Sequence, residues 1–388
     1  MDTCCIDQPG PLQGPASAPG LPEGVPPLRA FYLYMTTGCN LRCRHCWITP
    51  VFANGEPSPG DCIDPDVLQE AVREAKPLGL QSVKLTGGEP LMHPQFRQIA
   101  EFLAAQGIRS DMETNGTHIT PETARFLKER TAVHFISVSL DSIDAARHDD
   151  FRGVAGAFEA AVAGIANLVS AGYRPQVIMS LHRDNLGEID DMVDLATRLG
   201  ADSVKFNPIT NAGRGKRMHE QGKGLDYDQA RALLRYVHGD LRLRSRIRLF
   251  IGAPPALLTV DDLLRGRWRG QCNVGAIMGV LGTGHVALCG IGRNVPELCY
   301  GRLGKDHVGE LWLSNPFLAE LRAGLRGPFP GICGDCIHAG RCRTGCLAMN
   351  YMYAGRLFAP SPWCEEAAAR GHFPPTRRIG AEGEVYAS

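Results

Sequence analysis

The sequence has no excess of charge of either sign, and it lacks the features of a secreted or membrane-spanning chain. Lys plus Arg and Asp plus Glu number 41 each, so the formal net charge at pH 7 is zero. The chain therefore offers no basic field for a nucleic acid and no polybasic segment for an anionic membrane. Its apolar runs are too short to span a bilayer, and no signal-peptide pattern opens it. We expect a cytoplasmic protein.

Cysteine, by contrast, is abundant, with 14 residues. A disulfide framework is typical of short secreted proteins, whereas clustered thiols in a reducing compartment more often bind metal or take part in redox chemistry. Cys39, Cys43 and Cys46 form a C-x3-C-x2-C array. Such an array is consistent with a zinc knuckle, half of a disulfide framework, or an iron–sulfur ligand set that is one ligand short. Cys4 and Cys5 are expected to be incidental exposed thiols.

Zinc and iron–sulfur clusters make different demands on this array. Structural zinc usually takes four ligands, and the nearest candidate for the fourth, His45, is wedged between two of the cysteines. A [4Fe–4S] cluster also takes four ligands, so three thiolates would leave one iron open to a ligand from outside the protein.

From residue 31 to Pro208 the chain alternates short β-prone runs with helical segments. Helices of 10–15 residues between strands predict a parallel sheet with right-handed crossovers. Six strand–helix steps favour a partial (β/α)6 barrel over a complete one of eight. At the first helix, Asp64 is a predicted N-cap and Pro65 the first helical residue. The predicted strands cover 31–35, 82–85, 110–113, 134–140, 176–181 and 203–207.

The composition also divides the chain into segments. Residues 1–28 are rich in Pro, Gly and Ala and read as a flexible leader. The barrel core follows, and after a connecting region the chain becomes Gly- and Cys-rich, as in a small domain held by metal. The predicted boundaries are 1–28 for the leader, 29–210 for the barrel, 211–265 for the connecting region, 266–370 for the small domain and 371–388 for a tail.

Polar motifs follow four successive strands of the predicted barrel. The cysteine array follows the first strand, GGEP (87–90) the second, ETNG (113–116) the third and SLDS (139–142) the fourth. In β/α barrels the reactive centre lies at the carboxyl ends of the strands. Four such motifs at one face, one of them carrying three thiols, indicate a reaction site rather than turns.

C-x3-C-x2-C followed by GGEP resembles the radical S-adenosylmethionine superfamily over roughly residues 31–210. The resemblance implies that Cys39, Cys43 and Cys46 hold a [4Fe–4S] cluster and that S-adenosylmethionine chelates its open iron. Reductive cleavage of that cofactor would yield a 5′-deoxyadenosyl radical that takes a hydrogen atom from the substrate. The residues that the resemblance implies around the cofactor are His45, Gly87, Gly88, Glu89, Pro90, Thr114, Asn115, Ser139 and Arg152. Arg152 would pair with the methionine carboxylate, or else form a surface ion pair.

A second set of seven cysteines resembles the SPASM extension, which carries two auxiliary [4Fe–4S] clusters. Half of a zinc ribbon is the alternative for its C-x2-C pair, Cys333 and Cys336. By resemblance, one cluster would be held by Cys333, Cys336, Cys342 and Cys364, and the other, nearer to the reaction site, by Cys272, Cys289 and Cys346.

The nearer auxiliary cluster is one ligand short. Cys299, Cys62 and His285 are the available donors, and an open iron is the alternative. Cys289 is followed by Gly290, where sulfatase-maturing relatives have an Asp that accepts a proton, so formylglycine formation is not expected. No catalytic residue is assigned.

The whole-chain pattern resembles the SynChlorMet-cassette maturases of ribosomally made peptides. The expected reaction is carbon–carbon or thioether cross-linking of a precursor peptide. A PqqD-like recognition protein acting in trans and an electron donor such as flavodoxin or ferredoxin are the expected partners. Alternatives are dehydrogenation or epimerisation of a small molecule such as a sugar, an amine or a tetrapyrrole, peptide epimerisation with Cys62 as hydrogen donor, and a non-catalytic iron–sulfur carrier.

Overall fold

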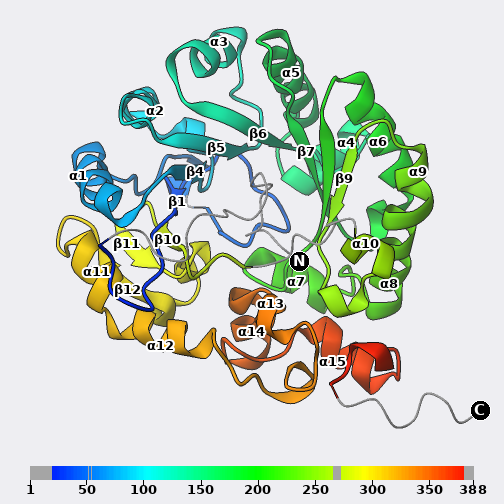
Figure 1. The fold of residues 1–388 in the computed structure, drawn as a ribbon. Helices are drawn as coiled ribbons and strands as arrows, with labels where there is room; N and C mark the ends of the chain where they lie inside the picture. The colour runs from blue at the N-terminus through cyan, green and yellow to red at the C-terminus, as the bar shows by residue number, and fades with distance from the viewer. Residues whose placement is uncertain (1–19, 51, 54, 265–271, 380–388) are drawn as a thin grey trace, which may run out of the picture.

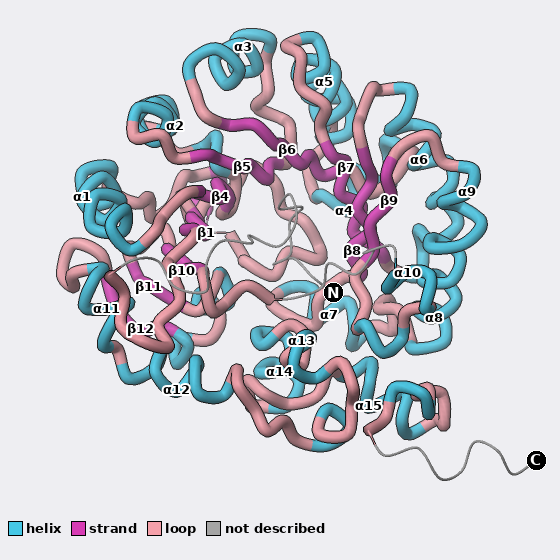
Figure 2. The backbone as a smooth tube through the Cα atoms, viewed as in Figure 1, coloured by secondary structure: helices cyan, strands magenta, loops and turns pink. Residues whose placement is uncertain are grey.

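A computed structural model describes residues 20–50, 52, 53, 55–264 and 272–379 (Figure 1). Its centre is a ten-stranded sheet in the order β12-β11-β10-β1-β4-β5-β6-β7-β8-β9. All pairings from β10 through β1 to β9 are parallel, and β11 and β12 are antiparallel. The large strands are β1 (Ala30–Tyr34), β4 (Ser82–Thr86), β5 (Arg109–Thr114), β6 (Val133–Ser139), β7 (Gln176–Leu181) and β8 (Ser203–Pro208). The prediction of a partial barrel is confirmed, because these six strands curve into an open ring (Figure 2).

Strands that the barrel prediction did not count extend both edges of the ring. β9 (Arg248–Ile251) pairs with β8, and β10 (Ile277–Val280) pairs in parallel with β1. The remaining strands are β11 (His285–Ala287), β12 (Cys299–Arg302) and a separate hairpin of β2 (Phe52–Ala53) and β3 (Glu56–Pro57). Segments from the predicted small domain therefore complete the wall of the barrel beside its first strand.

Helices cover the outside of the ring, and the first crossover helix carries the cap that its sequence predicts. Asp64 accepts hydrogen bonds from the backbone N–H groups of Asp66 and Val67, which confirms it as the N-cap. The crossover helices are α1 (Pro65–Ala75), α2 (Phe96–Ala105), α3 (Pro121–Arg130), α4 (Ala145–Arg152), α5 (Ala157–Ser170) and α6 (Ile189–Arg198). Each apolar face packs on the sheet, where residues such as Leu68, Ile99 and Leu127 are almost fully buried.

Of the later helices, α12 to α15 lie along the open side of the ring, whereas α9 lies outside its wall beside α6 (Figure 1). In Figure 1, α13 to α15 lie between α12 and α8. These helices are α7 (Arg214–Glu220), α8 (Tyr227–Tyr236), α9 (Arg242–Arg244), α10 (Val260–Leu264), α11 (Val308–Ser314), α12 (Pro316–Gly324), α13 (Ala339–Cys342), α14 (Leu347–Ala354) and α15 (Pro362–Ala369). No single helix in the described ranges is long and apolar enough to cross a membrane, although the bent pair α4 and α5 passes that test by length and composition.

The described end of the predicted leader packs on the core. Leu28 is fully buried, and its N–H donates to the carbonyl of Leu78. The indole N–H of Trp312 donates to the carbonyl of Pro26 at 2.8 Å, which joins this segment to α11. Cys4, Cys5, residues 265–271 and the end of the predicted tail lie outside the described residues.

Candidate active site

The cysteine array forms a loop between the end of β1 and the end of α4. The backbone N–H groups of Arg42 and Arg44 donate to the carbonyls of Arg152 and Phe151, each at 2.9 Å. Cys39 and Cys43 are buried and Cys46 is half-buried. All three line one cavity at the carboxyl ends of the strands, which we call the thiol cavity. This position is expected for a reaction site in a β/α barrel.

Glycines allow the GGEP segment to approach this loop. A Cβ on Gly88 would lie 1.7 Å from the carbonyl oxygen of Gly38, and Gly87 has a φ of 136°. The close approach is held by the Gly88 N–H, which donates to the Thr36 carbonyl, and by the Glu89 N–H, which donates to the Gly38 carbonyl. Only a residue without a Cβ fits here, so these glycines place backbone against the cavity.

The Glu89 side chain is part of the structural support of the site. It is fully buried and accepts hydrogen bonds from the Thr114 hydroxyl at 2.7 Å, the Asn115 N–H at 2.8 Å and the Leu91 N–H at 3.2 Å. Burial raises the pKa of Glu89 to about 7, against the opposing effect of these donors. The carboxyl group therefore links the ends of β4 and β5, and neither it nor Pro90 lines the cavity.

Asn115 and Arg152 contact the thiols. The Asn115 amide nitrogen lies 3.8 Å from the Cys39 sulfur and 2.8 Å from Asn40 Oδ1. The Arg152 Nη1 atom lies 3.6 Å from the Cys43 sulfur. Both residues line the cavity with Thr114 and Ser139, and the contact of these four residues with S-adenosylmethionine stays a prediction.

Arg152 is buried, so the alternative interpretation as a surface ion pair is wrong. Its Nε lies 2.5 Å from Oδ2 of Asp141, whose side chain is 1% exposed. Burial by itself would raise the pKa of Asp141, but the Arg152 guanidinium, together with His45, His148 and the Ser180 N–H, outweighs burial and holds that pKa at about 2. The same carboxylate raises the pKa of Arg152, although burial acts in the opposite direction. The pair thus places a permanent positive charge beside Cys43.

His45 is held in its neutral form. Its ring stacks on Phe151, with centroids 4.5 Å apart and planes 4° apart, and its Nε2 lies 3.2 Å from the Ser180 hydroxyl. Burial lowers its pKa to about 3. A neutral stacked imidazole thus forms part of the cavity wall.

Other residues of the cavity were missed by motif reading. Glu113 faces the cavity and pairs with buried Lys84 at 2.9 Å. The alternation of side chains along each strand could have identified these cavity residues, because every second side chain of a strand points to the same face. The additional lining residues include Trp47, Ile178, Ser180, Asn207 and Thr210.

The buried thiols fit a cluster that supplies positive charge. Burial, followed by the Cys43 thiol and Glu89, raises the pKa of Cys39, so the thiolates need a cation to be stable. No group of three or more Cys, His, Asp or Glu side chains in the described ranges is arranged around one metal ion. A [4Fe–4S] cluster instead takes each thiolate on a separate iron, so its ligands lie further apart than those of one zinc.

In the second cysteine set, four thiols gather between α13 and α15. The pKa of Cys364 is raised well above the ordinary value, first by burial and then by the charges of Cys333, Cys342 and Cys336. This mutual influence places the four residues of the predicted outer cluster together. Cys272 and Cys289 are buried in the main core, and Cys346 packs against it.

The spare donors lie in different surroundings. The Cys299 thiol is half-buried and lies 3.5 Å from the carbonyl oxygen of Gly292. Burial raises the pKa of Tyr300, and Arg322 acts in the opposite direction. The charges of Cys289 and Cys299 also raise this pKa, which places both thiols near Tyr300. Cys62 lies 3.7 Å from the carbonyl oxygen of Gly60 and does not line the thiol cavity. His285 is exposed and bonded to Thr283.

Residues 33–196 match the Radical SAM superfamily. An AdoMet-dependent heme synthase of Nitratidesulfovibrio vulgaris is 29% identical over 89% of this chain and 94% of that protein. The mycofactocin maturase MftC of Mycobacterium ulcerans is 28% identical over 85% of this chain and 86% of that protein.

Two solved structures share the fold. Streptococcus suis SuiB bound to S-adenosylmethionine superposes with a TM-score of 0.67 and 16% identity, over 87% of this chain and 77% of that one. The structure of anSMEcpe with bound AdoMet has a TM-score of 0.67 and 17% identity, over 89% and 98%. The described part of the chain therefore has the radical SAM fold, and the family that residues 33–196 match implies S-adenosylmethionine and a [4Fe–4S] cluster as cofactors. The SynChlorMet subgroup stays a prediction.

Proposed function

We propose that this radical SAM enzyme modifies a ribosomally made peptide, and that it does so by carbon–carbon or thioether cross-linking. The observation that carries the proposal is the thiol cavity, where Cys39, Cys43 and Cys46 meet most of the polar residues expected around the cofactor. The mycofactocin maturase relatives, which align over most of their length, support a peptide substrate.

The residues of the cavity have separate tasks in this proposal. Cys39, Cys43 and Cys46 would hold the cluster, and the Gly87–Gly88 backbone would receive S-adenosylmethionine. When bound, these cofactors supply a 5′-deoxyadenosyl radical. Arg152 keeps a positive charge beside Cys43, and neutral His45 closes the wall without adding charge. The protein thus contributes orientation and exclusion of water, while the cofactors contribute the hydrogen abstraction.

We further propose two auxiliary [4Fe–4S] clusters. Cys333, Cys336, Cys342 and Cys364 would hold the outer one. Cys272, Cys289 and Cys346 would hold the inner one, with either Cys299 or an open site as the fourth position. Iron analysis of anaerobically reconstituted protein tests this proposal, because three [4Fe–4S] clusters contain about twelve irons per chain. About four irons would refute both auxiliary sites.

The expected partners belong to the same proposal. A precursor peptide, a PqqD-like recognition protein in trans and a flavodoxin or ferredoxin as electron donor would meet in the cytoplasm. Tight binding of the precursor's leader by this chain alone would contradict recognition in trans.

Modification of a tetrapyrrole is the second candidate, because the heme synthase relative aligns over 94% of its own length. Anaerobic incubation with S-adenosylmethionine and dithionite should release 5′-deoxyadenosine, and Cys43→Ala should abolish the release. Mass spectrometry of the precursor peptide and of an iron tetrapyrrole then separates the two substrates. Change of the tetrapyrrole alone would refute the peptide proposal, and absence of 5′-deoxyadenosine from the wild type would refute both.

A further inference from the structure

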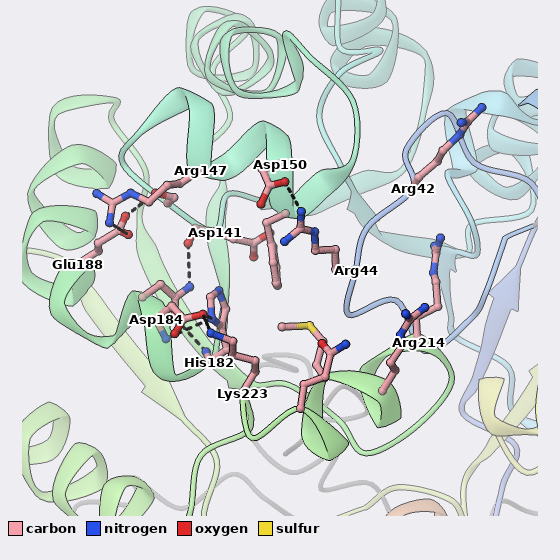
Figure 3. A pocket seen from close by; sticks show the side chains of 16 residues that line it. Arg42, Arg44, Asp141, Arg147, Asp150, His182, Asp184, Glu188, Arg214 and Lys223 are labelled. Atoms are coloured by element: carbon pink, nitrogen blue, oxygen red, sulfur yellow. Dashed lines mark hydrogen bonds and ion pairs between the residues drawn. The ribbon is translucent and has the colours of Figure 1, made fainter.

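A second cavity of about 580 Å³ lies beside the thiol cavity and has a different character (Figure 3). Its wall consists of the loop after β6, α4, the 3-10 helix Arg183–Glu188, α7 and the cysteine loop. Such a volume is typical of sites for small ligands or for a short peptide segment. The lining residues are mainly charged, with six Arg or Lys and four Asp or Glu.

One layer of side chains separates the two cavities. His45 lines the thiol cavity and stacks on Phe151, which lines the charged cavity and stacks in turn on His182 at 4.8 Å. The backbone N–H of Arg214 donates to the backbone carbonyl of Cys46 at 3.0 Å. A group bound in the charged cavity would therefore lie against the loop that carries the three thiols.

The four carboxylates of this cavity already have cationic partners. Figure 3 shows Arg44 beside Asp150, Arg147 beside Glu188, and Lys223 beside Asp184. The fourth carboxylate, Asp141, is paired with buried Arg152, which comes from outside the cavity. These pairs take up three of the six cations, and the remaining three are Arg42, Arg214 and Arg217.

Two of these remaining cations have no partner in the described part of the chain. Arg42 is accounted for, since it donates to the carbonyl of Gly55 and lies over the ring of Phe52. The Nε and Nη2 atoms of Arg214 are buried without a hydrogen-bond partner. Arg217 is exposed, one turn further along α7, and no described side chain bonds to it. Buried N–H groups without acceptors are costly, so these donors favour the binding of an acceptor in the cavity.

We propose that Arg214 and Arg217 bind a carboxylate in an acidic segment of the peptide, an inference that rests on the proposed peptide substrate. A planar guanidinium matches a planar carboxylate in two parallel hydrogen bonds. Inorganic phosphate is the competing anion in the test below, because a guanidinium also pairs with phosphate. The pocket thus selects peptides with Asp or Glu near the modified residue.

Fluorescence polarisation with two labelled hexapeptides tests this inference on the anaerobically reconstituted protein. The probes are Gly-Ser-Glu-Glu-Ser-Gly and its isosteric control Gly-Ser-Gln-Gln-Ser-Gly. The acidic probe should bind at least about tenfold more tightly, and added salt should weaken it, because salt screens the attraction. Arg214→Gln and Arg217→Gln should each weaken binding about tenfold or more.

Lys216 supplies the matched control, since it is an exposed cation on the same helix and does not line the cavity. Lys216→Gln should bind the acidic probe within about twofold of wild type. Should Arg214→Gln fail to fold, exposed Arg217→Gln still decides the matter. Equal binding of the two probes, or unchanged binding by Arg217→Gln, would overturn the inference. So would inorganic phosphate binding more tightly than the acidic probe.

Release of 5′-deoxyadenosine by the wild type is measured separately from peptide binding. Release without preference for the acidic probe would reject this pocket and leave the proposed function intact. Preference for the acidic probe without release would reject the proposed radical chemistry and leave the anion site intact.

Discussion

Replacement of Glu89 by Gln tests whether this buried carboxyl group is a structural link. In the structure, the Thr114 hydroxyl and the Leu91 N–H both donate to Oε1, and the Asn115 N–H donates to Oε2. A Gln could keep the two bonds to its oxygen, but its amide nitrogen would face the Asn115 N–H. One buried donor would then lose its acceptor, which costs about 1–3 kcal/mol of unfolding free energy.

The pH dependence sharpens this prediction. The folded-state pKa of Glu89 is about 7, above the ordinary value of 4.5. A raised carboxyl pKa means that its stabilisation is fully present below about 4.5 and is lost as the pH rises through about 7. The wild type should therefore lose this stability between pH 5.5 and 8, and Glu89→Gln should lose none from this site. The variant should be clearly less stable than wild type at pH 5.5, with a smaller difference at pH 8.

Urea unfolding followed by circular dichroism at pH 5.5 and pH 8 measures both effects on reduced protein without clusters. Glu129→Gln is the matched control, because Glu129 is exposed on α3. An unfolding midpoint of Glu89→Gln equal to that of the control at pH 5.5 would refute the hydrogen-bond argument. An equal difference from wild type at both pH values would refute the assignment of the raised pKa.

Three further predictions concern the same region and the second cysteine set. Arg152→Gln should lower the unfolding free energy by about 3–5 kcal/mol, because Asp141 would be left buried and unpaired. The double variant Arg152→Gln/Asp141→Asn should recover part of that loss in the same urea assay. Gly88→Ala should prevent normal assembly of the cysteine loop and lower the cluster absorbance near 400 nm, since its Cβ would lie 1.7 Å from a loop carbonyl oxygen. Gly187→Ala, whose Cβ meets open space, should retain the wild-type spectrum. Cys299→Ser should change the electron paramagnetic resonance signal of the inner auxiliary cluster if Cys299 is its fourth ligand, and an unchanged signal would favour an open site.

Local sequence patterns predicted the parallel strands and their helices well. The 176–181 strand has the predicted bounds, because a short apolar run flanked by polar residues is buried on both faces in a parallel sheet. Helix bounds were less regular. The 3-10 helix Arg183–Glu188 directly precedes α6, because the His182 side chain caps a separate turn there.

The role of Glu89 shows what motif reading cannot supply. The sequence places it in GGEP, next to glycines that do line the cavity. Its side chain instead points to donors from the end of β5, which lies 25 residues further along the chain. Which neighbour a side chain meets across a sheet depends on strand order and register, and these are tertiary properties.

By itself, the sequence determined the barrel strands and the spacing of the three thiols, since periodicity and motif spacing are local properties of the chain. It also placed the polar motifs at the carboxyl ends of the strands. Only the tertiary structure decided that Asp141 forms an ion pair with Arg152 beside Cys43 and that β10 pairs with β1. It alone left Arg214 and Arg217 facing a cavity whose carboxylates were already paired. The net charge of a buried site depends on every chain segment that packs there. A local sequence pattern covers only one of these segments and therefore cannot predict that charge.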